Sequence, residues 1–166
     1  MRIGFGYDSH RFITAKPNGE DGFAEGRPLV LGGVTIPFDK GLAAHSDGDV
    51  LIHAIIDALL GAAALGDIGS HFPDTDEKWK GADSGKLLAE VVREIRAAGY
   101  KIGNIDATVI CEQPKLRPCI DFIREHLAEV MNVDKGRISV KGKTNEKMDD
   151  VGAGVGIEVH AVCLLE

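Results

Sequence analysis

The longest apolar run of the chain predicts a buried helix over about residues 49–66. Its large apolar side chains lie nearly all round a helical wheel, which is typical of a helix with no solvent-facing side: Val50, Leu51, Ile52, Ile55, Ile56, Leu59 and Leu60. The polar exceptions, Asp49, His53 and Asp57, are spaced four residues apart and therefore share one face. Because unpaired burial of a neutral polar group costs roughly 2–7 kcal/mol, this stripe needs partners. A metal, a substrate or a subunit interface could supply them.

The residues before this helix predict an anion site. Ser46 and Asp49 have the spacing of a capping pair, so we expect the helix to begin near Ser46 or Asp47. Free backbone N–H groups at a helix start favour anions such as phosphate, and His45 would lie beside them. The alternative is an ordinary N-cap followed by a hydrogen-bonded core histidine at position 53.

Strict alternation predicts a strand over residues 2–12. One face carries the large apolar side chains, Ile3, Phe5 and Tyr7. Asp8 and His10 lie on the other face, next to two glycines. A carboxylate and an imidazole two residues apart on a strand can both reach one metal ion, and zinc then needs at least one more ligand from elsewhere. The alternative is a pair with a purely structural role.

The rest of the pattern alternates strands with helices. We expect strands over 29–37, 102–111, 137–143 and 157–165, helices over 84–99 and 118–131, a long loop over 66–84, and turns over 112–118 and 144–148. Residues 14–26 are read as a surface insertion. This order predicts a single α/β (α+β) domain over residues 1–166, a ferredoxin-like sandwich with helices packed on one face of a mixed β-sheet.

Composition and charge narrow the class of protein. The 166 residues carry a formal net charge of -7 with no basic block, so nucleic acid is not an expected partner. No apolar stretch has the length of a membrane span, so no membrane partner is expected. The three cysteines form no Cys-x-x-Cys pair, and the sequence opens with no signal-peptide pattern. We therefore expect a cytoplasmic protein with free thiols.

Four motifs in order span nearly the whole chain: DSH at 8–10, LGGV at 31–34, AHSDGDVLIHAIIDALLGAAALGDIGSHFPDTD at 44–76 and KTNEK at 143–147. With them the chain resembles the 2-C-methyl-D-erythritol 2,4-cyclodiphosphate synthase family. The resemblance implies a homotrimer with active sites between subunits. It also implies zinc bound by Asp8, His10 and His53, and a second divalent cation, Mg²⁺ or Mn²⁺, bound by Glu146. His45 and Thr144 are the implied transition-state stabilisers.

The same resemblance implies a cytidine diphosphate substrate. Its implied contacts are Asp8, Ser9, His10, His45, Ser46, Asp67, Ile68, Gly69, Phe72, Pro73, Asp74, Thr75, Asp76, Cys111, Glu112, Gln113, Pro114, Lys115, Leu116, Arg117, Lys143, Thr144, Asn145 and Glu146. The implied reaction converts 4-diphosphocytidyl-2-C-methyl-D-erythritol 2-phosphate to the 2,4-cyclodiphosphate with release of CMP, in the non-mevalonate isoprenoid pathway. Two alternatives stay open: a zinc-dependent phosphodiesterase that gives a linear product, and a metal-stabilised binding module without activity.

Overall fold

The computed structural model describes residues 1–13, 27–73, 75–79 and 81–166. Its elements in chain order are β1 (Arg2–Ile13), β2 (Leu29–Leu31), β3 (Val34–Ile36), β4 (Gly41–Leu42), α1 (Val50–Ala63), α2 (Ile68–His71), a 3-10 helix (Glu77–Trp79), α3 (Ser84–Ala97), β5 (Ile102–Ile110), α4 (Ile120–Met131), a second 3-10 helix (Lys135–Arg137), β6 (Ile138–Lys143), α5 (Asp149–Gly152) and β7 (Gly156–Leu165).

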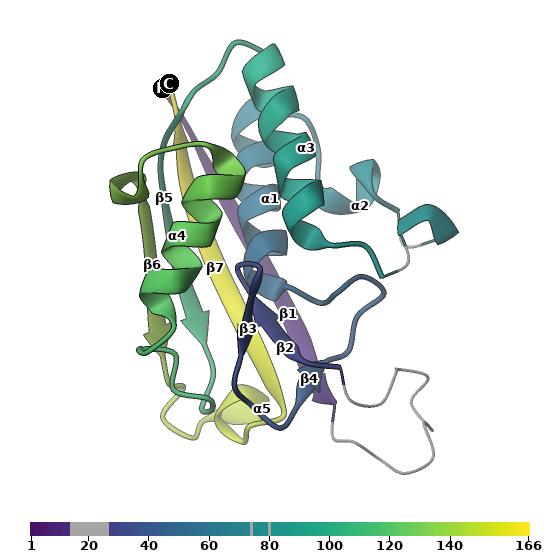
Figure 1. The fold of residues 1–166 in the computed structure, drawn as a ribbon, viewed down its shortest axis with the longest axis vertical. Helices are drawn as coiled ribbons and strands as arrows, with labels where there is room; N and C mark the ends of the chain where they lie inside the picture. The colour runs from purple at the N-terminus through teal and green to yellow at the C-terminus, as the bar shows by residue number, and fades with distance from the viewer. Residues whose placement is uncertain (14–26, 74, 80) are drawn as a thin grey trace.

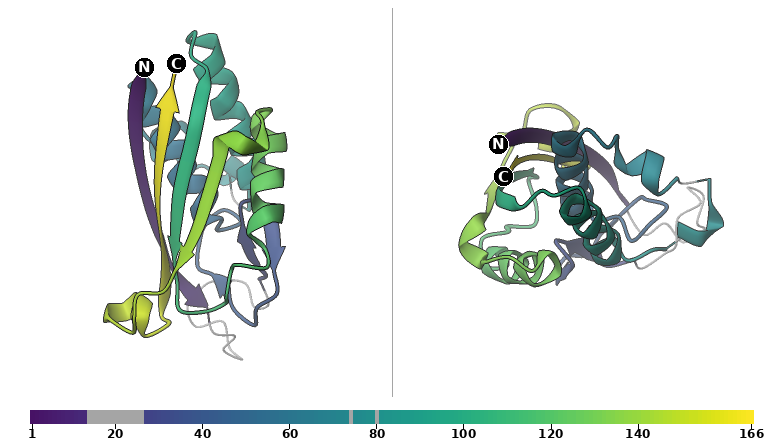
Figure 2. Two further views of the ribbon diagram at one scale, coloured as in Figure 1. Left: turned by 90° about the vertical axis from the view of Figure 1, so that its left-hand side faces the viewer. Right: turned by 90° about the horizontal axis from the view of Figure 1, so that it is seen from above.

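Five strands form one sheet in the order β4-β1-β7-β5-β6. Neighbouring strands are antiparallel except β5 and β6, which are parallel. β1 and β5 therefore point the same way with β7 between them, which is the split β-α-β arrangement of ferredoxin-like folds. The long helices α1, α3 and α4 all lie on one side of the sheet (Figures 1 and 2). The predicted mixed sheet with helices on one face is confirmed.

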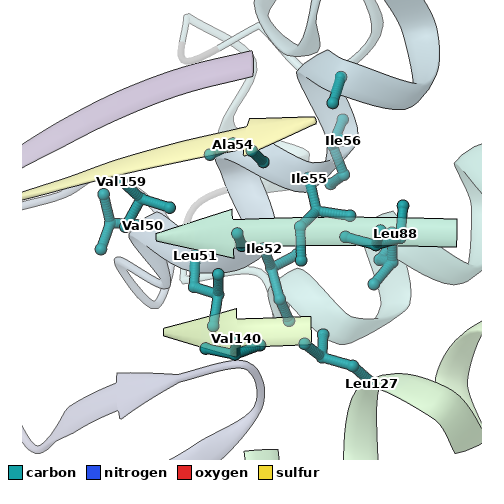
Figure 3. Packing of buried hydrophobic residues seen from close by; sticks show 14 of the residues in the cluster. Val50, Leu51, Ile52, Ala54, Ile55, Ile56, Leu88, Leu127, Val140 and Val159 are labelled. Atoms are coloured by element: carbon teal, nitrogen blue, oxygen red, sulfur yellow. The ribbon is translucent and has the colours of Figure 1, made fainter. Parts of the chain in front are cut away.

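The central helix α1 is buried, as its apolar pattern predicts. Eleven of its fourteen residues are buried, because the sheet covers one side and α3 packs against another. Figure 3 shows its side chains among Leu88, Leu127, Val140 and Val159, which come from α3, α4, β6 and β7. This helix is therefore the part of the core around which the layers are assembled.

The two faces of β1 are buried and exposed the opposite way from what side-chain hydrophobicity alone would indicate. The glycine face is the buried one: a Cβ at Gly6 would lie 1.9 Å from the carbonyl oxygen of Ala54, so α1 rests directly on the strand backbone. The apolar face is exposed instead, with Ile3 76% and Phe5 61% accessible. Tyr7 packs against His160 of β7 with the two rings tilted and their centroids 5.1 Å apart.

Several boundaries differ from the expected ones. α1 begins at Val50 with Asp49 as its N-cap, so the expected start near Ser46 or Asp47 is wrong. The single strand expected over 29–37 is a hairpin of β2 and β3. Gly32 and Gly33 have φ of 59° and 76°, and two successive positive φ values form the tight turn that reverses the chain.

The loop expected over 66–84 contains helical turns, α2 and the first 3-10 helix. The turn over 144–148 is followed by the short helix α5. The insertion predicted over 14–26 lies outside the described residues. Among the residues that the structure describes, no helix combines the length and the apolar character needed to cross a membrane.

Candidate functional site

Three metal-ligating side chains meet where α1 crosses β1. Their ligand atoms all lie within 4.8 Å of one another, and this is the only such group of three or more in the described part of the chain: Asp8, His10 and His53. His53 Nδ1 lies 3.0 Å from Asp8 Oδ2 and 3.3 Å from His10 Nε2. His10 Nε2 lies 3.3 Å from the same Asp8 oxygen. The patterns marked the strand pair and the helix histidine separately, and the structure brings together the three residues that the family resemblance joined at one metal.

Local structure explains why these three meet. Asp8 and His10 share one face of β1 because side chains alternate along a strand. Gly4 and Gly6 precede them on that face, and the absence of side chains there lets α1 approach the strand. The helix consequently brings His53, one turn after its N-cap, to the level of the two strand ligands.

The electrostatics of this group favour a cation between the ligands. Burial lowers the pKa of His10, although the negative charge of Asp8 acts to raise it. The lowered pKa favours the neutral imidazole, which has a lone pair to offer a metal. Burial also opposes charge on His53, but the hydrogen bond and negative charge of Asp8 outweigh it and raise the His53 pKa. Two imidazole nitrogens and one carboxylate oxygen at these distances form a donor set that suits zinc.

At the start of α1, the side chain of Asp49 acts as the N-cap. The carboxylate of Asp49, fully buried, accepts hydrogen bonds from the backbone N–H groups of Ile52, Gly32 and Gly33 at 3.0, 2.9 and 2.6 Å. It therefore satisfies the Ile52 N–H in the first turn of α1 and joins the helix start to the turn between β2 and β3. Burial raises the pKa of Asp49 to about 6, against the lowering effect of these three donors.

A pocket of about 350 Å³ opens beside the histidine pair. It brings together seven of the predicted residues, namely His10, His45, Ser46, His53, Ile68, Gly69 and Phe72. Three further lining residues were missed by sequence reasoning: Ala44, Trp79 and Leu87. The rings of Trp79 and Phe72 pack edge to face with their centroids 5.0 Å apart. Together they form an aromatic wall on one side of the pocket.

Other residues predicted near this pocket do not line it. Ser9 is exposed on the opposite side of β1 from its neighbours, and only its backbone N–H reaches Asp8, at 2.8 Å. Asp67 caps α2 by accepting from Ser70. Pro73, Thr75 and Asp76 lie along the following segment, outside the pocket lining, and Asp74 falls outside the described residues.

A second pocket, of about 770 Å³, lies between β6 and the turn after β5. Its lining includes the predicted residues Cys111, Pro114, Lys115, Leu116, Arg117, Lys143, Thr144 and Glu146, and also Ile120, Asp121, Lys141 and Gly142. Thr144 Oγ1 donates to Glu146 Oε1 at 2.5 Å. The two pockets share no lining residue, so the structure divides the predicted site into two groups.

Three other predicted residues do not line this second pocket, and two of them stabilise the loop beside it. Glu112 Oε1 accepts from the backbone N–H groups of Asn145 and Lys147 at 3.0 and 3.1 Å. The Asn145 amide donates to the carbonyl of Met148, and Gln113 is exposed. Glu112 therefore fixes the loop that carries Glu146, a residue held at a φ of 51°.

Comparison with known proteins places this arrangement in a family. The model of the YgbB family matches residues 1–166. The chain belongs to the YgbB family. Among its relatives, 2-C-methyl-D-erythritol 2,4-cyclodiphosphate synthase of Laribacter hongkongensis is 55% identical over 166 residues, covering 100% of this chain and 96% of that protein. The Clostridium perfringens protein of the same name is 53% identical over 165 residues, 99% of each chain.

Several solved structures share the fold. A 2C-methyl-D-erythritol-2,4-cyclodiphosphate synthase in its CDP-bound form matches with a TM-score of 0.85 and 40% identity, covering 99% of this chain and 100% of that one. The bifunctional IspDF of Campylobacter jejuni matches with a TM-score of 0.89 and 40% identity. That match covers 99% of this chain but 42% of the longer protein.

Proposed function

We propose that the chain is a 2-C-methyl-D-erythritol 2,4-cyclodiphosphate synthase, an enzyme of isoprenoid biosynthesis. Its YgbB membership and the shared name of its relatives support this activity. The observation that carries it is the convergence of Asp8, His10 and His53 beside a pocket that both histidines line. The substrate is 4-diphosphocytidyl-2-C-methyl-D-erythritol 2-phosphate, and the products are the cyclic diphosphate and CMP.

Zinc is the metal that fits the three ligands. Two imidazoles and a carboxylate are borderline-soft donors that zinc accepts, and three protein ligands leave a fourth position for a substrate oxygen. When bound, zinc would supply positive charge to polarise a phosphate. Glu146 is an exposed carboxylate on a loop that lines the second pocket, which suits Mg²⁺ or Mn²⁺, since these ions combine one or two carboxylates with substrate phosphates.

The chain's own residues contribute mainly by positioning. The attacking 2-phosphate and the departing CMP are both anions already, so little proton transfer is needed. Holding tethered groups in line supplies roughly 7–11 kcal/mol in favourable cases. His45 and Ser46 would contact the diphosphate from one pocket, and Lys143 and Thr144 from the other, which places donors on the charge that develops during transfer.

A homotrimer explains why one chain carries two separate half-sites. Neighbouring strands lie about 4.8 Å apart, so β1 and β6, three steps apart in the sheet order, are separated by roughly 14 Å. The exposed apolar side chains of Ile3, Phe5 and Tyr7 on β1 continue onto Val162 of β7. Such a patch supports an interface between copies, which would join the metal pocket of one subunit to the cytidine pocket of the next.

Phosphorus NMR of the reaction products tests this function. We expect a cyclic diphosphate and CMP from the wild-type chain, and loss of both the zinc and the product in His53→Ala. His126→Ala changes a histidine of α4 outside both catalytic pockets and should keep its zinc. A linear phosphate product would instead identify a phosphodiesterase, and full turnover by a zinc-free His53→Ala would contradict the ligand assignment.

A further inference from the structure

The far side of the His53 imidazole meets a buried serine. Its Nε2 lies 3.0 Å from the hydroxyl of Ser84, the first residue of α3. Ser84 is 0% exposed and is one of three buried polar residues among those described. A hydroxyl at a helix start usually serves as the N-cap. Here Asp83 is the N-cap and accepts from Gly85 N at 2.8 Å, so the Ser84 hydroxyl is available to His53.

Asp47, the next residue beyond Ser84, decides which way the hydrogen bonds of the Ser84 hydroxyl run. The hydroxyl of Ser84 donates to Asp47 Oδ1 at 2.5 Å, because an ionised carboxylate can only accept. A serine has one proton to donate, and this bond uses it. Toward His53, therefore, the Ser84 oxygen can only accept, and the proton between them must lie on His53 Nε2.

Asp47 is itself held in place by the backbone. Its Oδ2 accepts from Ser84 N at 2.8 Å, and its Oδ1 accepts from Asp49 N at 3.2 Å. Its own N–H donates to the carbonyl of Ala82 at 3.1 Å. These bonds join the loop before α1 to the start of α3, so the acceptor for Ser84 has a fixed position.

We infer that Ser84 and Asp47 are positioning residues that keep the His53 proton on Nε2 and so present the Nδ1 lone pair to the metal. The inference rests on the proposed metal site at Asp8, His10 and His53. Without this pair, the Asp8 carboxylate, 3.0 Å from Nδ1, would draw the proton to the wrong nitrogen. A neutral histidine with its proton on Nδ1 cannot bind a metal through that atom.

Ser46 offers a competing partner on the same side of the ring. Its hydroxyl lies 3.2 Å from His53 Nε2, farther than that of Ser84, and accepts from Gly48 N at 3.2 Å. Ser46 lines the open pocket, whereas Ser84 is closed off from solvent. The buried partner has the stronger effect on the tautomer because water does not compete for the hydrogen bond.

Zinc affinity of the full chain tests the inference. Competition with a chromogenic chelator should show roughly ten- to hundred-fold weaker zinc binding by Ser84→Ala, as for other residues that orient a metal ligand. Ser139→Ala removes an exposed serine from β6 and should leave the affinity unchanged. If Ser84→Ala lowers the melting temperature of the zinc-free chain but binds zinc as tightly as wild type, its role is structural and the inference is wrong.

A second measurement needs no variant that must fold. In the zinc-loaded wild type, nitrogen-15 NMR of histidine should show the His53 proton on Nε2, exchanging slowly with water. Rapid exchange, or a His53 proton found on Nδ1, would overturn the assignment to Ser84. A wild-type chain that fails to bind zinc at all would instead refute the proposed metal site, which keeps the two failures distinguishable.

Discussion

The close contact between β1 and α1 predicts that Gly6→Ala will damage the metal site without touching a ligand. The added Cβ would lie 1.9 Å from the carbonyl oxygen of Ala54 and 2.7 Å from the backbone nitrogen of Ala58. Both are backbone atoms of α1, so no side-chain rotation relieves the overlap. The helix must move away from the strand.

The size of that movement sets the size of the effect. Real Cβ atoms do not approach other heavy atoms closer than 3.0 Å, so the 1.9 Å contact must lengthen by about 1.1 Å. Metal–ligand distances in a functional site tolerate only about 0.2 Å. His53 follows Ile52 and precedes Ala54 on α1, so its imidazole moves with the helix away from Asp8. We expect at least a hundredfold loss of turnover and about 1–3 kcal/mol lower unfolding free energy from overpacking.

The assay is zinc affinity together with urea unfolding of the zinc-free chain. Gly61→Ala is the matched control, because it adds the same methyl group to α1 itself where the nearest atom, Phe5 O, is 3.9 Å away. It should keep zinc affinity and raise stability by about 1 kcal/mol through helix propensity. If Gly6→Ala binds zinc and unfolds like wild type, close packing of α1 on β1 does not determine the ligand geometry.

Three further outcomes follow from the site. Burial raises the pKa of Asp49 to about 6, so its folded form holds a proton that the unfolded chain releases near pH 4. The stability advantage of wild type over Asp49→Asn should therefore shrink by about 2 kcal/mol between pH 4 and 6.5 in urea unfolding; a widening gap would mean that the three backbone donors outweigh burial. Glu146→Gln should raise the Mg²⁺ or Mn²⁺ concentration needed for half-maximal turnover, and an unchanged metal titration would count against this role. Glu112→Ala should release Asn145 N and Lys147 N and lower kcat roughly tenfold with the zinc affinity unaltered; loss of zinc affinity would show that the two pockets are not separate.

Residue patterns predicted most of the elements because burial alternates with the period of each one. β5 buries every second side chain, and α1 buries nearly all of its positions. The same reasoning marked the two parts of the ligand trio, since a strand pair and a helix stripe each place polar groups on one face, but only the family resemblance joined them. The roles of Thr144 and Glu146, in contrast, came from the family resemblance.

The errors have a common physical origin in contacts between segments far apart in the chain. Asp49 closes the start of α1 because its carboxylate reaches the Gly32–Gly33 turn, and no local pattern reveals a partner seventeen residues away. Ser84 likewise resembles an ordinary helix start until Asp47 and His53 are found beside it. The Gly-Gly pair did contain a usable signal, because two glycines between apolar runs are typical of a hairpin.

The most direct measurement is an anomalous difference map, collected at the zinc absorption edge from a crystal of the zinc-loaded chain. We predict its strongest peak in contact with Asp8, His10 and His53. If the crystal contains zinc but the peak lies elsewhere, or if the two imidazoles point away from one another, the proposed metal site is wrong and the mechanism built on it fails.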